Sequence, residues 1–174
     1  NTLNAVKKVQ KDAGYSDDMI GESLTAKVFK QILSCDALVC VSDGDEKIRK
    51  IQQTLNHDYG EMFDIIPCDG RYNSKMAKAL IYAFQKEGGL GIDVANGNFG
   101  PATQNIAQSH VQSINAYEKN FVKLAKFALY CNGKRRNGIN AFDCSSNDEF
   151  TGDFDDIMRE KVIEFQKFTG MLEV

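Results

Sequence analysis

Two short patterns recur along this chain, and that repetition is the strongest constraint on how it can fold. The first pattern is "FQKEGGL" from Phe84, which recurs as "FQKFTGM" from Phe165 and, more loosely, as "VQKDAGY" from Val9. Each reads as the end of a helix, where glycine takes a left-handed conformation and the next apolar residue folds back onto the last turn. The chain is therefore predicted to consist of repeated helical modules.

The second pattern predicts a tight turn followed by a helix. A polar residue, a glycine, any residue and a large apolar residue occur in "CDGRYNSKM", "FTGDFDDIM" and "ANGNFGPAT", while "SDDMIGESL" has Asp18 in place of the glycine. Asp-Gly and Asn-Gly tolerate the positive φ that such reversals need, and Pro101 suits the first position of a helix. The apolar members are each predicted to fill a core position: Ile20, Tyr72, Phe99 and Phe154.

Apolar residues at helical spacing predict an all-α fold. Amphipathic stripes occur at Ile48 to Leu55, Met76 to Phe84, Phe121 to Ala128 and Met158 to Phe165. The only strand-like run, "ALVCV" from Ala37, is short. No apolar run approaches the roughly 20 residues of a membrane-spanning helix.

The ordered segments "IRKIQQTLN", "IIPCDGRY", "ALIYAFQKEGG", "ANGNFGPAT" and "FVKLAKFALYCNG" resemble the peptidoglycan-binding-domain-like family of three-helix modules. They are most similar to the tandem modules that accompany a lysozyme-like glycoside-hydrolase domain. The resemblance implies one complete module at residues 45–116, with incomplete modules at 1–44 and 117–174. Where the turns depart from the family pattern, the residues predicted to begin the helices are Asn73 or Ser74, Asp155 and Gly21.

The same resemblance implies a non-catalytic region that binds peptidoglycan or muropeptides. It would belong to a secreted protein of Gram-positive bacteria, extracellular and associated with the cell wall. A lysozyme-like catalytic domain in the same polypeptide would cut the glycan, while these modules supply attachment. Linking weakly binding modules raises their combined affinity through a high effective concentration.

The composition argues against several other functions. The net charge is −3, so nucleic acid and anionic membranes are not expected partners. His57 and His110 are the only histidines and fit no zinc motif, and the 143–154 loop lacks the glycine and glutamate of a calcium loop. We therefore expect no metal, no cofactor and no catalysis.

The five cysteines form no CxxC pair, and their odd number leaves at least one unpaired. Cys68 and Cys131, which have apolar neighbours, are interpreted as small buried hydrophobic residues. A Cys131–Cys144 or Cys35–Cys40 disulfide remains an alternative at this point.

The candidate ligand contacts lie around the turns of the central module. A muropeptide offers amides, carboxylates and hydroxyls, which suit backbone N–H groups, asparagines and tyrosines. The candidates are Asp69, Gly70, Arg71, Tyr72, Asn73, Asn96, Asn98 and Thr103. Turn chemistry alone would select the same residue types. In the absence of tryptophan, the side chains considered for stacking on sugars are Tyr72, Tyr82 and Tyr130.

Two other functions stay open at the level of sequence. One is a helical interaction scaffold that has lost its ligand. The other is a small hydrolase that uses "GKRRNGINAFDCSSNDE" as its active loop. Incomplete terminal modules would also leave apolar faces uncovered, which predicts packing on the central module, self-association or continuation in a longer protein.

Overall fold

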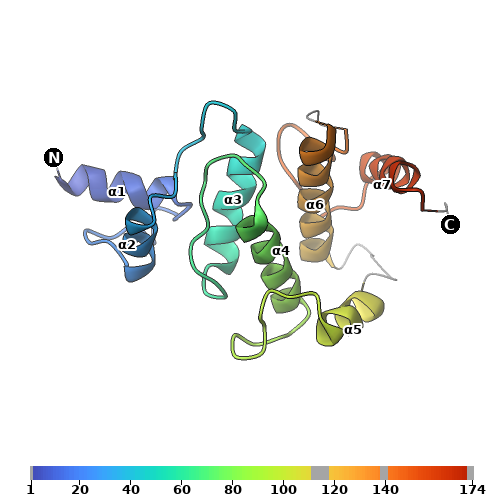
Figure 1. Cartoon of the computed structure of the whole chain (residues 1–174), viewed down its shortest axis with the longest axis horizontal. Helices are drawn as coiled ribbons and strands as arrows, with labels where there is room; N and C mark the ends of the chain where they lie inside the picture. Colours follow the sequence, from blue (N-terminus) through green and yellow to red (C-terminus); the bar gives the residue numbers. More distant parts are fainter. Residues whose placement is uncertain (1, 111–117, 138–140, 172–174) are drawn as a thin grey trace. The chain divides into compact units, whose positions relative to one another are not determined.

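The computed structural model describes residues 2–110, 118–137 and 141–171, which form helices joined by loops (Figure 1). The helices are α1 (Thr2–Asp12), α2 (Ala26–Leu33), α3 (Glu46–Tyr59), α4 (Ser74–Glu87), α5 (Pro101–His110), α6 (Lys119–Asn137) and α7 (Asp156–Thr169). Within these ranges no strand forms, and an isolated backbone pairing joins Ser146 to Glu149. The predicted all-α class is confirmed.

The helices belong to two compact units. The first unit comprises residues 1–86 and 90–98, and so holds α1, α2, α3 and nearly all of α4. The second unit comprises residues 87–89 and 99–174, and so holds α5, α6 and α7. These units differ from the sequence modules 1–44, 45–116 and 117–174, whose boundaries stay a prediction.

The first unit is built on amphipathic helices whose apolar faces are buried. On α3 and α4 the predicted stripes are largely buried, with Ile51 and Leu55 on one helix and Met76 and Ala83 on the other at most 1% exposed. A separate cluster of buried Ala13, Val28 and Ile65 joins the α1–α2 region to the segment before α4. The packing of the N-terminal helices therefore depends on residues well beyond them in sequence.

The core of the second unit lies between α6 and α7, which pack against each other. Val122, Leu129, Phe142, Cys144 and Met158 form its buried cluster. The ring of Phe142 meets that of Phe165 edge-on, with centroids 5.3 Å apart. The loop between the two helices thus contributes to the core.

Short polar side chains begin several of the helices. Asp155 accepts a hydrogen bond from Met158 N at 2.8 Å, and Asn73 accepts one from Met76 N at 3.0 Å, as predicted. The prediction for Gly21 is wrong, because α2 starts at Ala26 and Thr25 caps it through Val28 N at 3.3 Å. Gly21 lacks the side-chain oxygen that such a cap requires.

The predicted helix endings are confirmed at all three repeats. Gly14, Gly89 and Gly170 have φ values of 100°, 84° and 73°. In each case the next residue donates its N–H to the carbonyl of the repeated glutamine: Tyr15 to Gln10 at 3.1 Å, Leu90 to Gln85 at 2.9 Å and Met171 to Gln166 at 2.9 Å. This is the bond that closes a left-handed helix ending.

The predicted apolar plugs are the main error in the expected fold. Phe99 is 55% exposed and Phe154 37% exposed, while Ile20 and Tyr72 are half-buried. The turns that contain Phe99 and Phe154 are therefore not anchored by these side chains. Polar contacts from neighbouring helices hold them instead, as described below.

Gly70 combines a positive φ with close backbone neighbours, and its replacement by alanine should destabilise the first unit by about 2 kcal/mol. Its φ is 78°, and an added Cβ would lie 2.7 Å from Asp45 N and 2.8 Å from Cys40 Sγ. The matched control is Gly91→Ala, because a Cβ there meets nothing within 4 Å. Chemical denaturation followed by circular dichroism measures both variants, and equal stability of the two would contradict this account.

Candidate functional site

A buried glutamine of α3 binds the first glycine turn of the central module. Gln52 is fully buried, and its Oε1 accepts the Gly70 N–H at 2.9 Å. Its Nε2 donates to Asp69 Oδ1 at 2.9 Å and to the Arg71 carbonyl at 3.0 Å. One amide side chain therefore pairs with both a backbone N–H and a backbone carbonyl of the turn.

The same arrangement recurs at two other turns. On α4, Gln85 Oε1 accepts the N–H groups of Asn96 and Gly97 at 3.1 and 3.0 Å, and its Nε2 donates to the Asn98 carbonyl at 3.0 Å. On α1, Gln10 Oε1 accepts from Gly21 N at 2.8 Å, and Nε2 donates to the carbonyls of Gly21 and Ser23 at 3.1 Å. We call each such pairing of a buried helical glutamine with a turn a glutamine clamp.

A lysine takes the place of the glutamine in the second unit. Lys126 lies on α6 and contacts the turn that precedes α7. Lys126 is fully buried, and its Nζ lies 3.4 Å from Thr151 Oγ1 and 2.9 Å from Asp155 Oδ2. This turn is thus held by a charged pair.

Asp155 is ionised more readily than an ordinary aspartate. Partial burial acts to raise its pKa, but the hydrogen bond from Met158 N and the contact with Lys126 outweigh that effect and lower the pKa below 3.8. The carboxylate therefore caps α7 and neutralises the buried ammonium at the same time.

The structure gives four of the eight predicted ligand residues a role in holding the turns. Asp69, Gly70, Asn96 and Asn98 all contact the glutamine clamps. Asn96 Oδ1 also accepts from Asn98 N at 2.9 Å. Their predicted contact with a ligand stays a prediction, and it would have to use the groups that the clamps leave free.

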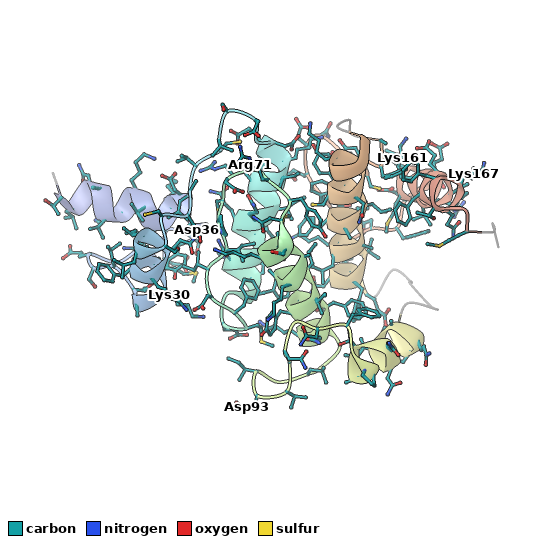
Figure 2. All side chains as sticks on the ribbon, in the orientation of Figure 1. Lys30, Asp36, Arg71, Asp93, Lys161 and Lys167 are labelled. Carbon is teal, nitrogen blue, oxygen red and sulfur yellow. The ribbon has the colours of Figure 1, made fainter. Side chains whose placement is uncertain are left out.

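The other predicted ligand residues have different surroundings. Arg71 is exposed (Figure 2). It pairs with Asp43, its Nε lying 3.0 Å from Oδ1, and this hydrogen bond lowers the pKa of Asp43. Asn73 caps α4, Tyr72 is half-buried, and Thr103 is 1% exposed within the second unit. Arg71 is therefore the most accessible member of the predicted set in the first turn.

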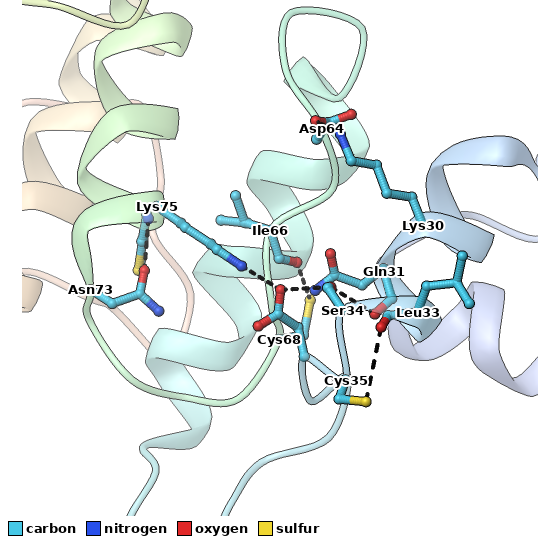
Figure 3. A network of polar contacts seen from close by, with 12 residues as sticks. Lys30, Gln31, Leu33, Ser34, Cys35, Asp64, Ile66, Cys68, Asn73 and Lys75 are labelled. Atoms are coloured by element: carbon cyan, nitrogen blue, oxygen red, sulfur yellow. Dashed lines mark hydrogen bonds and ion pairs between the residues drawn. The ribbon is translucent and has the colours of Figure 1, made fainter.

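A groove of ≈ 570 Å³ lies within the first unit, away from the predicted residues. Its walls are α2, the segment 61–66 and the first half of α4. Figure 3 shows part of this wall, with Lys75 extending from α4 towards Gln31 and Ser34. Its volume falls within the range of sites that bind small ligands. We call it the α2–α4 groove.

Charged side chains surround the α2–α4 groove. Lys27, Lys30, Lys75 and Lys78 face Asp36, Glu61 and Asp64. Lys30 pairs with Asp64 at 2.6 Å, Lys75 with Asp36, and Glu61 with Lys86. Burial acts to raise the pKa of Asp36, but hydrogen bonds from Lys75 and Ser34 lower it overall. The three carboxylates therefore already have cationic partners.

The floor and one side of the groove are apolar. Met62, Ile65 and Ala79 are buried lining residues. The rings of Phe63 and Tyr82 lie 5.8 Å apart at a 37° tilt. Of the tyrosines considered for stacking, Tyr82 lines the groove, whereas Tyr130 is only 1% exposed, so its predicted availability is wrong.

Sequence reasoning missed this groove because its walls are distant along the chain. Lys27 and Tyr82 belong to different sequence modules, and no motif links them. The one available signal was the spacing of Lys75, Lys78 and Tyr82, which places them near one face of α4.

Other features of the chain offer little chemistry. All five cysteines are free, so neither alternative disulfide forms, and Cys68 and Cys131 are buried as interpreted. Burial raises the pKa of Cys68 to about 12.

Among the described residues no cluster of three His, Cys, Asp or Glu side chains could hold a metal ion. Across the same residues, no helix combines the length and apolarity needed to span a membrane.

Comparison with known proteins identifies the family. The model of the FadG/YbfG PGDB-like domain matches residues 41–174. "Uncharacterized protein YbfG" of Bacillus subtilis (strain 168) is 40% identical over 168 residues, covering 96% of this chain and 21% of that protein. "Uncharacterized protein FadG" of the same strain is 36% identical over 174 residues, covering 98% of this chain and 27% of that protein.

This chain therefore spans about a quarter of the length of these two relatives. No solved structure matches it. The family model covers both compact units in whole or in part, and it includes the turns held by Gln52, Gln85 and Lys126. The chain belongs to the FadG/YbfG family of peptidoglycan-binding-like (PGDB-like) domains.

Proposed function

We propose that this chain binds peptidoglycan and supplies non-catalytic attachment to the bacterial cell wall. The observation that carries the proposal is the match of residues 41–174 to a peptidoglycan-binding-like domain. The repeated clamps give this proposal a structural basis, since they hold three successive turns of the chain in one defined conformation. Rigid turns present backbone and side-chain groups to a ligand at low entropic cost.

We further propose that the chain acts as one part of a longer, cell-wall-associated protein outside the cell. The two relatives are each several times longer than the aligned region, so those proteins contain further sequence. A lysozyme-like hydrolase in the same polypeptide is the partner that the sequence resemblance implies. In this arrangement the present chain contributes attachment and the partner domain contributes cleavage.

Co-sedimentation with purified sacculi tests the proposal directly. The folded chain should pellet with Gram-positive sacculi, whereas the same chain after heat denaturation and removal of aggregates should not. Arg71→Ala tests the turn itself, because Arg71 is its exposed cation and caps no helix. A several-fold loss of retention would place the turn in the binding surface.

The other two functions give different outcomes in the same assay. A scaffold that has lost its ligand would leave the folded chain in the supernatant, which would overturn the proposed function. A hydrolase would release soluble muropeptides from the sacculi. Mass spectrometry of the supernatant detects such release, and its occurrence with the purified chain would overturn the non-catalytic assignment.

A further inference from the structure

We infer that the α2–α4 groove binds the free carboxylate end of a short peptide with small apolar side chains, such as the alanine-terminated peptide stem of peptidoglycan. This inference rests on the proposed function and deepens it, because it assigns recognition to the peptide and to a surface separate from the glycine turns. Its basis is the combination of surplus positive charge, an apolar floor and a buried amide at one place.

The groove carries more positive charge than its own carboxylates neutralise. Four lysines and three carboxylates line it, in a chain whose net charge is −3. The acids are engaged by Lys75, Lys30 and Lys86, as described above. Among the described residues, Lys27 and Lys78 form no ion pair within 4 Å of a carboxylate, although Lys27 is near enough to Glu61 to help lower the pKa of that carboxylate.

These two lysines differ in what they can offer a ligand. Lys27 Nζ donates to the carbonyls of Gly60 and, at 3.0 Å, of Phe63, so most of its donor capacity is used in fixing the 60–63 segment. Lys78 is exposed, and its Nζ lies 5.9 Å from the centre of the Tyr82 ring. Lys78 is therefore the cation that can pair with an incoming carboxylate.

The apolar part of the groove limits what can accompany that carboxylate. Met62, Ile65 and Ala79 supply a floor suited to methyl groups, and the tilted Phe63–Tyr82 pair supplies a flat side. Gln31 lines the same groove and is 5% exposed. Its amide lies close enough to Asp36 to help lower the pKa of that carboxylate. Among the described residues, however, no acceptor lies in hydrogen-bond geometry with Gln31 Nε2.

A buried donor without an acceptor is costly, so it marks a place where a ligand acceptor improves the structure. A peptide end supplies what the groove lacks: a carboxylate for Lys78, a carbonyl for the Gln31 amide after a small side-chain adjustment, and methyl groups for the floor. Uncharged sugars supply hydroxyls but no anion for Lys78. The groove chemistry therefore favours peptide over glycan.

Titration of the chain with diacetyl-Lys-D-Ala-D-Ala tests the inference, since that peptide carries a single carboxylate. Its C-terminal amide, which lacks the charge, is the matched ligand. We expect the acid to bind about tenfold more tightly than the amide, because one charge-assisted contact is lost. Binding of the acid should also weaken as salt is raised.

Lys78→Gln is the matched variant, and Lys50→Gln on the exposed side of α3 is its control. Lys78→Gln should weaken acid binding about tenfold and leave amide binding unchanged, whereas Lys50→Gln should change neither. Circular dichroism confirms that both variants are folded. Equal affinity of Lys78→Gln and the unchanged chain for the acid, or binding of peptide-free chitin oligomers alone, would overturn the inference.

Sacculus binding separates failure of this inference from failure of the proposed function. If sacculi retain the unchanged chain and Lys78→Gln equally, peptidoglycan attachment stands and only the role of the groove is overturned. A folded chain that sacculi do not retain would overturn both.

Discussion

Asp155→Ala is expected to lower the free energy of unfolding of the second unit by about 3–5 kcal/mol. The substitution removes the carboxylate oxygen that lies 2.9 Å from the ammonium of the fully buried Lys126, so that charge loses its partner. It also removes the oxygen that accepts the Met158 N–H at the start of α7. A cap alone is worth about 1 kcal/mol, so the unpaired buried charge dominates. The chain has no tryptophan, so unfolding is best followed by far-UV circular dichroism.

The neighbouring carboxylate provides the control for this variant. Asp156 is 94% exposed and pairs with Arg159 at 3.4 Å on the protein surface, so Asp156→Ala should change stability by less than about 0.5 kcal/mol. The double variant Lys126→Met with Asp155→Ala should recover at least half of the loss, since no buried charge remains. A double variant as unstable as Asp155→Ala alone would show that the charge is not the cause.

The contribution of the Lys126–Asp155 pair to stability should depend on pH in the acid range. The folded-state pKa of Asp155 lies below its usual 3.8, so its contribution to stability is present above pH 3.8 and disappears as the pH falls through the folded value. The stability difference between the unchanged chain and Asp155→Ala should therefore narrow between about pH 4 and pH 2. A difference that stays constant across this interval would contradict the assignment.

Gln52→Leu is expected to destabilise the first unit by about 3 kcal/mol, although leucine has nearly the size of glutamine. The change leaves the Gly70 N–H and the Arg71 carbonyl without their partner at 2.9 and 3.0 Å. Asp69 Oδ1 keeps its bond from Arg71 N at 2.9 Å, so the loss concerns mainly two backbone groups. Hydrogen exchange should show faster exchange of the Gly70 amide proton.

The adjacent glutamine is a control of the same chemistry. Gln53 is half-buried, and its Nε2 makes one bond, to the Asp12 carbonyl at 3.1 Å. Gln53→Leu should therefore cost about 1 kcal/mol. Similar losses for the two substitutions would mean that the glutamine clamp contributes no more than an ordinary hydrogen bond.

Local signals in the sequence were sufficient for the helices and their ends. The apolar spacing of Ile48, Ile51 and Leu55 requires one buried helical face, and α3 has it. Gly14, Gly89 and Gly170 end helices because only glycine takes a positive φ at little cost, which is a property of the residue itself. Such features depend on neighbours within a few positions, so they can be predicted without a tertiary structure.

The anchoring of the turns and the position of the groove could not be predicted in that way. Phe99 was expected to be buried because it is large and apolar, yet the Gln85 amide holds this turn and the ring is 55% exposed. A buried glutamine resembles a surface glutamine in sequence, since its partners lie 11 to 19 residues away. Four of the ligand residues proposed from turn chemistry, Asp69, Gly70, Asn96 and Asn98, contact these clamps, and the binding role of the whole set stays a prediction.

The sequence by itself determined the helical class, the repeat and the chemistry of each turn, because helix periodicity and left-handed glycines are local properties. Only the tertiary structure decided that Gln10, Gln52, Gln85 and Lys126 are buried, and that α2 and α4 enclose a charged groove within the first unit. The physical reason is that burial and pairing are set by which distant segments meet. The same polar side chain in water would have none of these partners.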